Sequence, residues 1–132
     1  MVVDCVDSLP VPRLSLRLGE ETAWTFFQGV QRFTAGLVQA RRWVYRSGPI
    51  VLLRFAPPSL EDRLITWPIQ GGILTRRSGG SLELTLTDNL LTARVHGYHP
   101  RLPALLYRLI QLPLHHWITR QSLRRLIKTL NE

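Results

Sequence analysis

Three side chains that can exchange protons or hydrogen bonds recur at helical spacing near the C-terminus. Tyr107, Gln111 and His115 stand at i, i+4 and i+8 and therefore share one stripe of a helix. A tyrosine and a histidine can donate, accept or transfer a proton, which is what enolisation or aldol closure requires. The stripe is either a solvated side of the helix or the edge of a cavity.

The helix that carries this stripe is predicted from about Pro103 to Leu130, with Pro103 in its first turn. Apolar residues form one side of its first half and continue after a phase shift near Arg120. The two sets are Leu106, Leu109, Ile110, Pro113 and Trp117, then Leu123, Leu126, Ile127 and Leu130. We expect this side to pack on a sheet, with the Tyr107 stripe offset from it. Pro113 lacks a backbone donor and predicts a kink or a break.

The middle of the chain alternates apolar and polar residues in short segments separated by turns, which is typical of antiparallel strands with one buried face. After a short first strand at 13–18 and a helix at 21–33, strands are predicted at 50–56, 62–69, 73–77, 81–87 and 90–98. Residues 36–46 fit either a strand or a continuation of the helix. A strand is favoured there because Trp43, Val44 and Tyr45 suit extended structure.

This order predicts an α+β fold in a single domain that spans residues 1–132. A curved antiparallel sheet of about six to seven strands must bury its apolar face. The only large element left to cover that face is the long C-terminal helix. We therefore expect the sheet to grip this helix.

The charge of the chain is strongly positive, with 17 basic against 9 acidic residues and a net charge of +8. The basic residues are scattered, and they accompany no helix-turn-helix, zinc-finger or RNA-binding pattern, so nucleic acid is not the favoured partner. The basic, amphipathic end of the C-terminal helix allows a weak contact with an anionic membrane surface. The oligomeric state is left open, a dimer included.

Cellular context and metal chemistry follow from a few residues. Cys5 is the single cysteine, and the N-terminal segment lacks a basic leader, so the cytoplasm is the expected compartment. No apolar run is long enough to predict a membrane-spanning helix.

His115 and His116 are adjacent and point about 100° apart on a helix, so they do not suit one metal ion. We expect neither a metal nor another cofactor.

Four short motifs resemble an uncharacterised bacterial branch of the START-like helix-grip superfamily. They are WPIQGG (67–72), RRSGGSLEL (76–84), GYHPRLP (97–103) and YRLIQLPLHH (107–116). The similarity is best over residues 62–125. The superfamily includes polyketide cyclases, lipid-transfer domains and carriers of small hydrophobic ligands. Fold analogy is an associational argument for function.

The resemblance implies an apolar cavity between the curved sheet and the C-terminal helix. It places Tyr98 at the mouth of that cavity and lets Trp67 line it. The expected ligand-binding residues are Trp67, Tyr98, Tyr107, Gln111 and His115. His96 is expected on the opposite, solvent-facing side of its strand.

Three hypotheses for function follow. The first is binding of an apolar, lipid-like or polyketide-like molecule in the cavity. The second is a cofactor-free cyclase or dehydratase in which His115 acts as base or acid and Tyr107 polarises a carbonyl. The third is a protein-interaction module whose cavity has collapsed.

Overall fold

The computed structural model describes residues 2–11, 18–87 and 90–130. In chain order its elements are β1 (Val3–Pro10), α1 (Glu20–Phe27), α2 (Gly29–Phe33), β2 (Gln39–Arg41), β3 (Val44–Ser47), β4 (Ile50–Phe55), β5 (Ser59–Leu60), β6 (Leu64–Gly71), β7 (Ser81–Thr87), β8 (Leu90–Tyr98), α3 (Ala104–Leu106), η1 (Tyr107–Gln111) and α4 (Leu112–Leu130).

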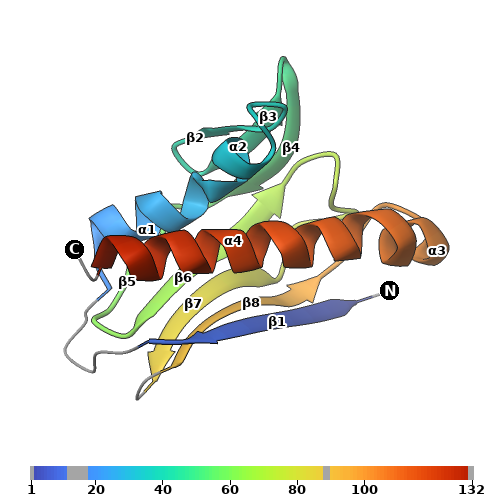
Figure 1. Cartoon of the computed structure of the whole chain (residues 1–132). Helices are drawn as coiled ribbons and strands as arrows, with labels where there is room; N and C mark the ends of the chain where they lie inside the picture. Colours follow the sequence, from blue (N-terminus) through green and yellow to red (C-terminus); the bar gives the residue numbers. More distant parts are fainter. Residues whose placement is uncertain (1, 12–17, 88–89, 131–132) are drawn as a thin grey trace.

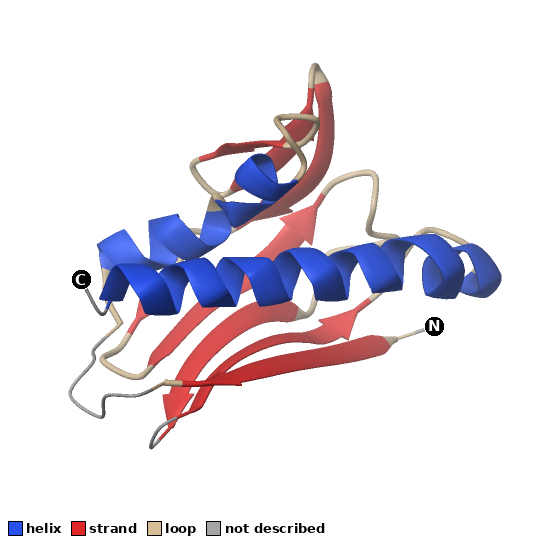
Figure 2. Cartoon of the chain, in the orientation of Figure 1, coloured by secondary structure: helices blue, strands red, loops and turns tan. Residues whose placement is uncertain are grey.

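The strands form an antiparallel sheet in the order β1-β8-β7-β6-β4-β3-β2, and the short β5 pairs with β6. The sheet curves, and α4 crosses its concave face beside α1 and α2 (Figures 1 and 2). The structure thus confirms the predicted α+β class and the curved antiparallel sheet that grips a long C-terminal helix.

The first described strand is β1, which the sequence analysis missed. It pairs with β8 along its length, from Val3 opposite Tyr98 to Pro10 opposite Leu90. Its alternation is masked because Asp7, a charged residue, takes a core-facing position between Cys5 and Leu9. Most of the strand predicted at 13–18 lies outside the described residues.

Two other predicted segments differ in the structure. Residues 73–77 are a loop instead of a strand, with a single bridge from Thr75 to Pro100. The chain leaves β6 through Gly72, whose φ of +119° suits glycine, and a Cβ there would meet the Leu52 carbonyl oxygen at 2.3 Å. Residues 36–46 do not continue the helix. The favoured strand is confirmed in part, because β2 and β3 form a hairpin that turns at Arg42 and Trp43, whereas residues 36–38 are a turn and a bend.

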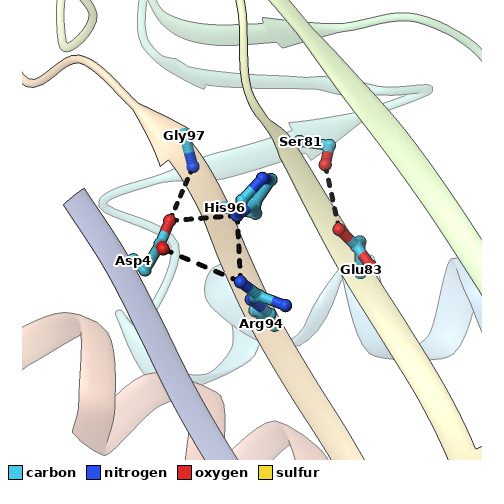
Figure 3. A network of polar contacts seen from close by, with 6 residues as sticks. All are labelled: Asp4, Ser81, Glu83, Arg94, His96 and Gly97. Carbon is cyan, nitrogen blue, oxygen red and sulfur yellow. Dashed lines mark hydrogen bonds and ion pairs between the residues drawn. The ribbon is translucent and has the colours of Figure 1, made fainter. Parts of the chain in front are cut away.

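A bulge joins β1 to β8, and a polar network on the outer face of the sheet stabilises it (Figure 3). The register shifts there, so that Asp4 faces two residues of β8, His96 and Gly97. The Asp4 carboxylate accepts the Gly97 N–H at 2.8 Å and lies 3.1 Å from Nδ1 of His96. The Gly97 N–H lowers the pKa of Asp4. His96 is exposed on the outer face, as predicted.

Aromatic rings fill the core between α1 and the sheet. Phe27 is fully buried, stacks on Tyr45 with ring centroids 4.2 Å apart and meets Trp43 and Phe55 edge-on. Trp67 is also fully buried, 6.1 Å from Phe27. This cluster fixes α1 on the sheet and sets the distance between the sheet and the helices above it.

A glycine lets the two helical layers approach closely. Gly29 begins α2 and faces the buried Ser122 of α4, and a Cβ on Gly29 would lie 2.1 Å from Oγ of Ser122. Although glycine weakens a helix, here it allows α2 to lie directly against α4. The contact brings α2 to the edge of the space beneath α4.

We predict that Phe27→Ala lowers the free energy of unfolding by about 3–5 kcal/mol, because it removes the centre of the aromatic cluster. Urea denaturation measures the loss. Phe33→Ala is the matched control, since Phe33 is only half-buried and meets Trp117 at one edge. An equal loss in both variants would contradict the central role of Phe27.

Candidate functional site

A π-helical turn precedes the proline in the C-terminal helix. η1 spans Tyr107–Gln111, and the N–H of Leu112 reaches back to the carbonyl oxygen of Tyr107. Pro113 then stands in the first turn of α4. The wider turn accommodates a residue that has no N–H and whose ring would collide with the carbonyl of a regular preceding turn. The break predicted at Pro113 is thus absorbed without separating the two helical parts.

The orientation of this helix corrects one prediction. The side formed by Leu109, Ile110 and Trp117 was expected to pack on the sheet, but these side chains are exposed, as are Leu106 and Pro113. The sheet-facing side in α4 is built from Leu123 and Leu126, as predicted for the second half, together with Thr119 and Ser122. The Tyr107 stripe, not the apolar side, faces inward.

A cavity of about 200 Å³ lies beneath this stripe, between the sheet, α2 and the C-terminal helix. Its lining comes from every layer of the fold and is mostly apolar. The lining residues are Cys5, Phe26, Val30, Thr34, Val38, Tyr45, Leu52, Leu53, Phe55, Ile69, Leu74, Leu82, Val95, Tyr98, Tyr107, Gln111, Leu114, His115, Ile118 and Thr119.

Four of the five predicted ligand-binding residues share this lining. Tyr98, Tyr107, Gln111 and His115 all border the cavity. Trp67 does not, because its ring packs among Phe26, Phe27 and Trp43 in the aromatic core. We therefore remove Trp67 from the candidate site.

A chain of hydrogen bonds fixes the polar wall of the cavity. The hydroxyl of Tyr98 donates its single proton to the carbonyl oxygen of Leu74, so it can only accept from Gln111. The Gln111 amide consequently turns Nε2 towards Tyr98, at 2.9 Å. Its Oε1 is buried without a hydrogen-bond partner. This wall thus presents an unused acceptor.

Two further polar groups meet beside this wall. The Tyr107 hydroxyl lies 3.3 Å from Sγ of Cys5, and both side chains are buried. Burial raises the pKa of the Tyr107 hydroxyl and that of the Cys5 thiol, and burial also raises the pKa of Tyr98. These groups are therefore neutral donors and acceptors at pH 7.

His115 completes the polar side of the cavity. Burial lowers its pKa to about 4, and the neighbouring His116 adds to the effect while Asp7 opposes it. The imidazole is consequently uncharged at neutral pH. A neutral imidazole offers one donor and one acceptor but no attraction for an anionic ligand.

A buried carboxylate holds α4 over the cavity. The side chain of Asp7 on β1 is only 1% exposed and binds Nδ1 of His116 at 2.7 Å. Its other oxygen binds Nε of Arg120 at 3.2 Å. Both partners stand one turn apart on α4, so one carboxylate fixes the helix on the edge strand. This pair of contacts sets the position of His115, the neighbour of His116.

Sequence reasoning missed several residues of the site. Cys5 and Asp7 were hidden because their strand was not recognised. The i, i+4 spacing of His116 and Arg120 is a signal for a shared acidic partner, but nothing in the sequence identifies Asp7 as that partner. The apolar wall from α2 and β4 depends on three-dimensional packing and leaves no local pattern.

The outer face of the sheet carries side chains of the types found in a catalytic triad, but not their geometry. Ser81 and His96 stand opposite one another on β7 and β8, and His96 contacts Asp4. The Ser81 hydroxyl, however, donates to Glu83 at 3.3 Å, and no dashed contact joins it to His96 in Figure 3. This network is exposed and serves the bulge between β1 and β8.

Metal-ligating side chains do not cluster in the described part of the chain, where no three His, Cys, Asp or Glu residues lie together in a group that could hold an ion. The described helices also include none that is long and apolar enough to cross a membrane.

Comparison with known proteins adds no relative. No protein-family model matches the sequence, and no curated protein is a significant match to it. The function is therefore argued from the geometry of the cavity and of the surface around it.

We predict that Asp7→Asn lowers the free energy of unfolding by about 1–3 kcal/mol, because two charge-assisted hydrogen bonds to α4 are lost. Chemical denaturation monitored by circular dichroism measures the change. Asp4→Asn on the same strand is the matched control, because its ion pairs are exposed to solvent and contribute less to stability. Equal losses in the two variants would argue against Asp7 as an anchor.

We also predict a specific acid sensitivity from His115. Its folded pKa of about 4 lies below the ordinary value of 6.5, so below pH 6.5 the unfolded chain takes up a proton that the folded chain does not. Stability should fall as pH drops from about 6.5 to about 4. His115→Gln should reduce the change in melting temperature with pH between these values, as measured by differential scanning calorimetry. His96→Gln should leave that pH dependence unchanged. An unchanged pH profile in His115→Gln would refute the assignment.

Proposed function

We propose that this protein binds a small, uncharged and largely apolar molecule that carries a hydroxyl or N–H group. The binding site is the cavity between the sheet and the C-terminal helix. Tyr98, Tyr107, Gln111 and His115 form its polar side and orient the ligand. The rest of the lining supplies apolar contact.

The observation that carries this proposal is the unused acceptor on Gln111. A buried polar atom without a partner costs about 1–3 kcal/mol. Among the described residues four side-chain atoms are of this kind, and Gln111 is the one of the four residues that borders the cavity; the others are Arg46, Trp67 and Ser122. Oε1 of Gln111 is buried and unpaired at the border of an apolar cavity. A ligand O–H or N–H placed there removes the cost, whereas a ligand that has only acceptors does not.

The size and charge of the cavity narrow the ligand class. A volume of about 200 Å³ exceeds that of an engineered cavity of ~150 Å³ that holds benzene, and it lies below the ~300–1,000 Å³ of pockets for drug-sized ligands. One or two fused rings, or a short acyl chain, fit this space. The apolar lining and the neutral His115 disfavour an ionised ligand.

The electrostatics of the site favour binding over the alternative cyclase activity. A general base works best when its pKa lies near the working pH. His115, with a pKa of about 4, is a weak proton acceptor at pH 7. The Tyr107 hydroxyl already contacts Cys5. Both residues are better suited to recognising a hydroxylated ligand than to transferring its protons.

The arrangement also supports membership of the START-like helix-grip superfamily, which we infer from the four sequence motifs together with the sheet, helix and cavity order. A carrier in that superfamily holds its ligand in the corresponding space. The free, buried thiol of Cys5 suits a reducing compartment, and we place the function in the cytoplasm on that basis.

We predict that 1-naphthol binds about ten-fold more tightly than naphthalene, because only the former donates a hydrogen bond to Gln111. Titration followed by tryptophan fluorescence measures both affinities. Gln111→Leu should reduce the difference to within about two-fold. It removes the unpaired Oε1 together with the hydrogen bond from Nε2 to Tyr98, so the free energy of unfolding of the ligand-free protein should change by less than about 1 kcal/mol.

Gln121→Leu is the matched control, because Gln121 stands on α4 without bordering the cavity. It should keep the preference for naphthol. Failure of both compounds to bind the unaltered protein would overturn the proposal, and so would an unchanged preference in Gln111→Leu.

A further inference from the structure

The outward surface of the C-terminal helix is divided along its length into an apolar and a basic half. Leu105 and Leu109 are 68% and 65% exposed, and Ile110, Leu114 and Trp117 are each about half exposed. We call these five side chains the apolar face. The following turns expose a basic face made of Arg120, Arg124 and Lys128.

An apolar face of this kind is unusual on a helix that meets water. A surface helix normally turns charged and polar residues outward. Between Leu105 and Trp117 the five side chains of the apolar face are instead exposed, and Arg108 is the exposed charged residue among them. A contiguous exposed apolar patch marks an interaction surface.

The apolar face lies at the edge of the cavity. Leu114 both lines the cavity and is 51% exposed. The loop that follows β6 reaches the same end of the helix, since the Leu74 carbonyl accepts the N–H of Arg101, just before α3 (Figure 1). Ile73 on that loop is 50% exposed and Leu74 lines the cavity. Exposed apolar side chains therefore flank the cavity from two separate segments.

The charge of the helix decides what can cover this face. The sequence holds no aspartate or glutamate between Ala104 and Leu130, while Arg108, Arg124 and Lys128 are basic and exposed. Arg120 is also basic, and it already binds Asp7. A symmetric dimer through this helix would set basic side chains against basic side chains without an acidic partner. An anionic occupant satisfies the same charges.

We propose that this face docks on an anionic lipid bilayer. The apolar face enters the boundary between headgroups and acyl chains, as leucine and tryptophan do on interfacial helices, and the basic face contacts phosphate headgroups. Docking in this orientation turns the edge of the cavity that lies beside Leu114 and Ile73 towards the lipid. The inference rests on the exposed surface and does not require the cavity to hold a ligand.

Cosedimentation of the full chain with lipid vesicles tests this proposal. Vesicles of phosphatidylcholine with about 30% phosphatidylglycerol should bind the protein, and pure phosphatidylcholine should bind it at least about ten-fold more weakly. Raising the salt from about 0.1 M to about 0.5 M should weaken the binding, because the headgroup charges are screened. Binding that ignores both lipid charge and salt would overturn the proposal.

Two variants separate the apolar from the electrostatic contribution. Leu105→Gln with Leu109→Gln should weaken vesicle binding about ten-fold or more without changing the melting temperature, since both side chains are exposed. If the double change alters the circular dichroism spectrum, Leu109→Gln alone serves the same test. Arg124→Gln with Lys128→Gln should weaken binding about five-fold for each charge removed.

Leu60→Gln with Leu90→Gln is the matched control. These leucines are 43% and 39% exposed and lie on β5 and at the start of β8, at the opposite end of the sheet from α3. The control should bind vesicles as the unaltered protein does. Equal weakening in the control would overturn the assignment to the helix.

Other occupants of the face give distinct results. If the protein is a dimer by sedimentation analysis and Leu105→Gln with Leu109→Gln makes it a monomer while vesicles go unbound, the face is a dimer interface and the proposal is wrong. If vesicles go unbound and duplex DNA is bound at near-physiological salt, the basic face serves nucleic acid and the proposal is equally wrong.

Discussion

The carboxylate of Asp7 is buried between β1 and α4, where it binds His116 and Arg120. β1 is the edge strand at one end of the sheet, and β8 is its single neighbour in the strand order. Removing a carboxylate from water is costly, so its place in the core is stable only while both partners on the helix are aligned. The contact therefore fixes the helix along the strand in one register. Cys5 on β1 and Tyr107 on the helix side meet across the cavity because of that alignment.

Several polar groups that line the cavity are buried in a way that lowers the stability of the folded protein. Oε1 of Gln111 has no partner, and burial shifts the pKa values of Tyr107 and His115 away from their ordinary values in the direction of the neutral forms. Buried polar groups held in an unfavourable state beside a cavity are typical of a binding site, which supports the proposal that a ligand occupies this space.

The sequence predicted those parts of the fold that local patterns encode, namely the α+β class, most strands, the final helix and the stripe of Tyr107, Gln111 and His115. It failed where a distant partner changes the meaning of a residue. In the sequence, the charge of Asp7 interrupts the apolar alternation of β1. Its burial is explained only by its partners on α4, which the structure reveals. The orientation of Trp117 was predicted wrongly because an apolar side chain favours burial, whereas the side of the helix that faces the sheet is set by the contacts of Leu123 and Leu126. Gly72 marked a turn, but its crowding against β4 appears only in three dimensions.

The C-terminal helix is thus held unevenly, and this unevenness connects the cavity to the surface. Its second half is secured by Leu123 and Leu126 in the core and by the Asp7 contacts. Its first half buries Tyr107 but leaves Leu105 and Leu109 in solvent. A segment with little buried apolar surface opens at the lowest free-energy cost. The part of the helix that is easiest to displace is therefore the part that closes the cavity and carries the apolar face. The lipid surface that we propose for this face would therefore lie at the edge of the cavity, where Leu114 is both exposed and part of the lining.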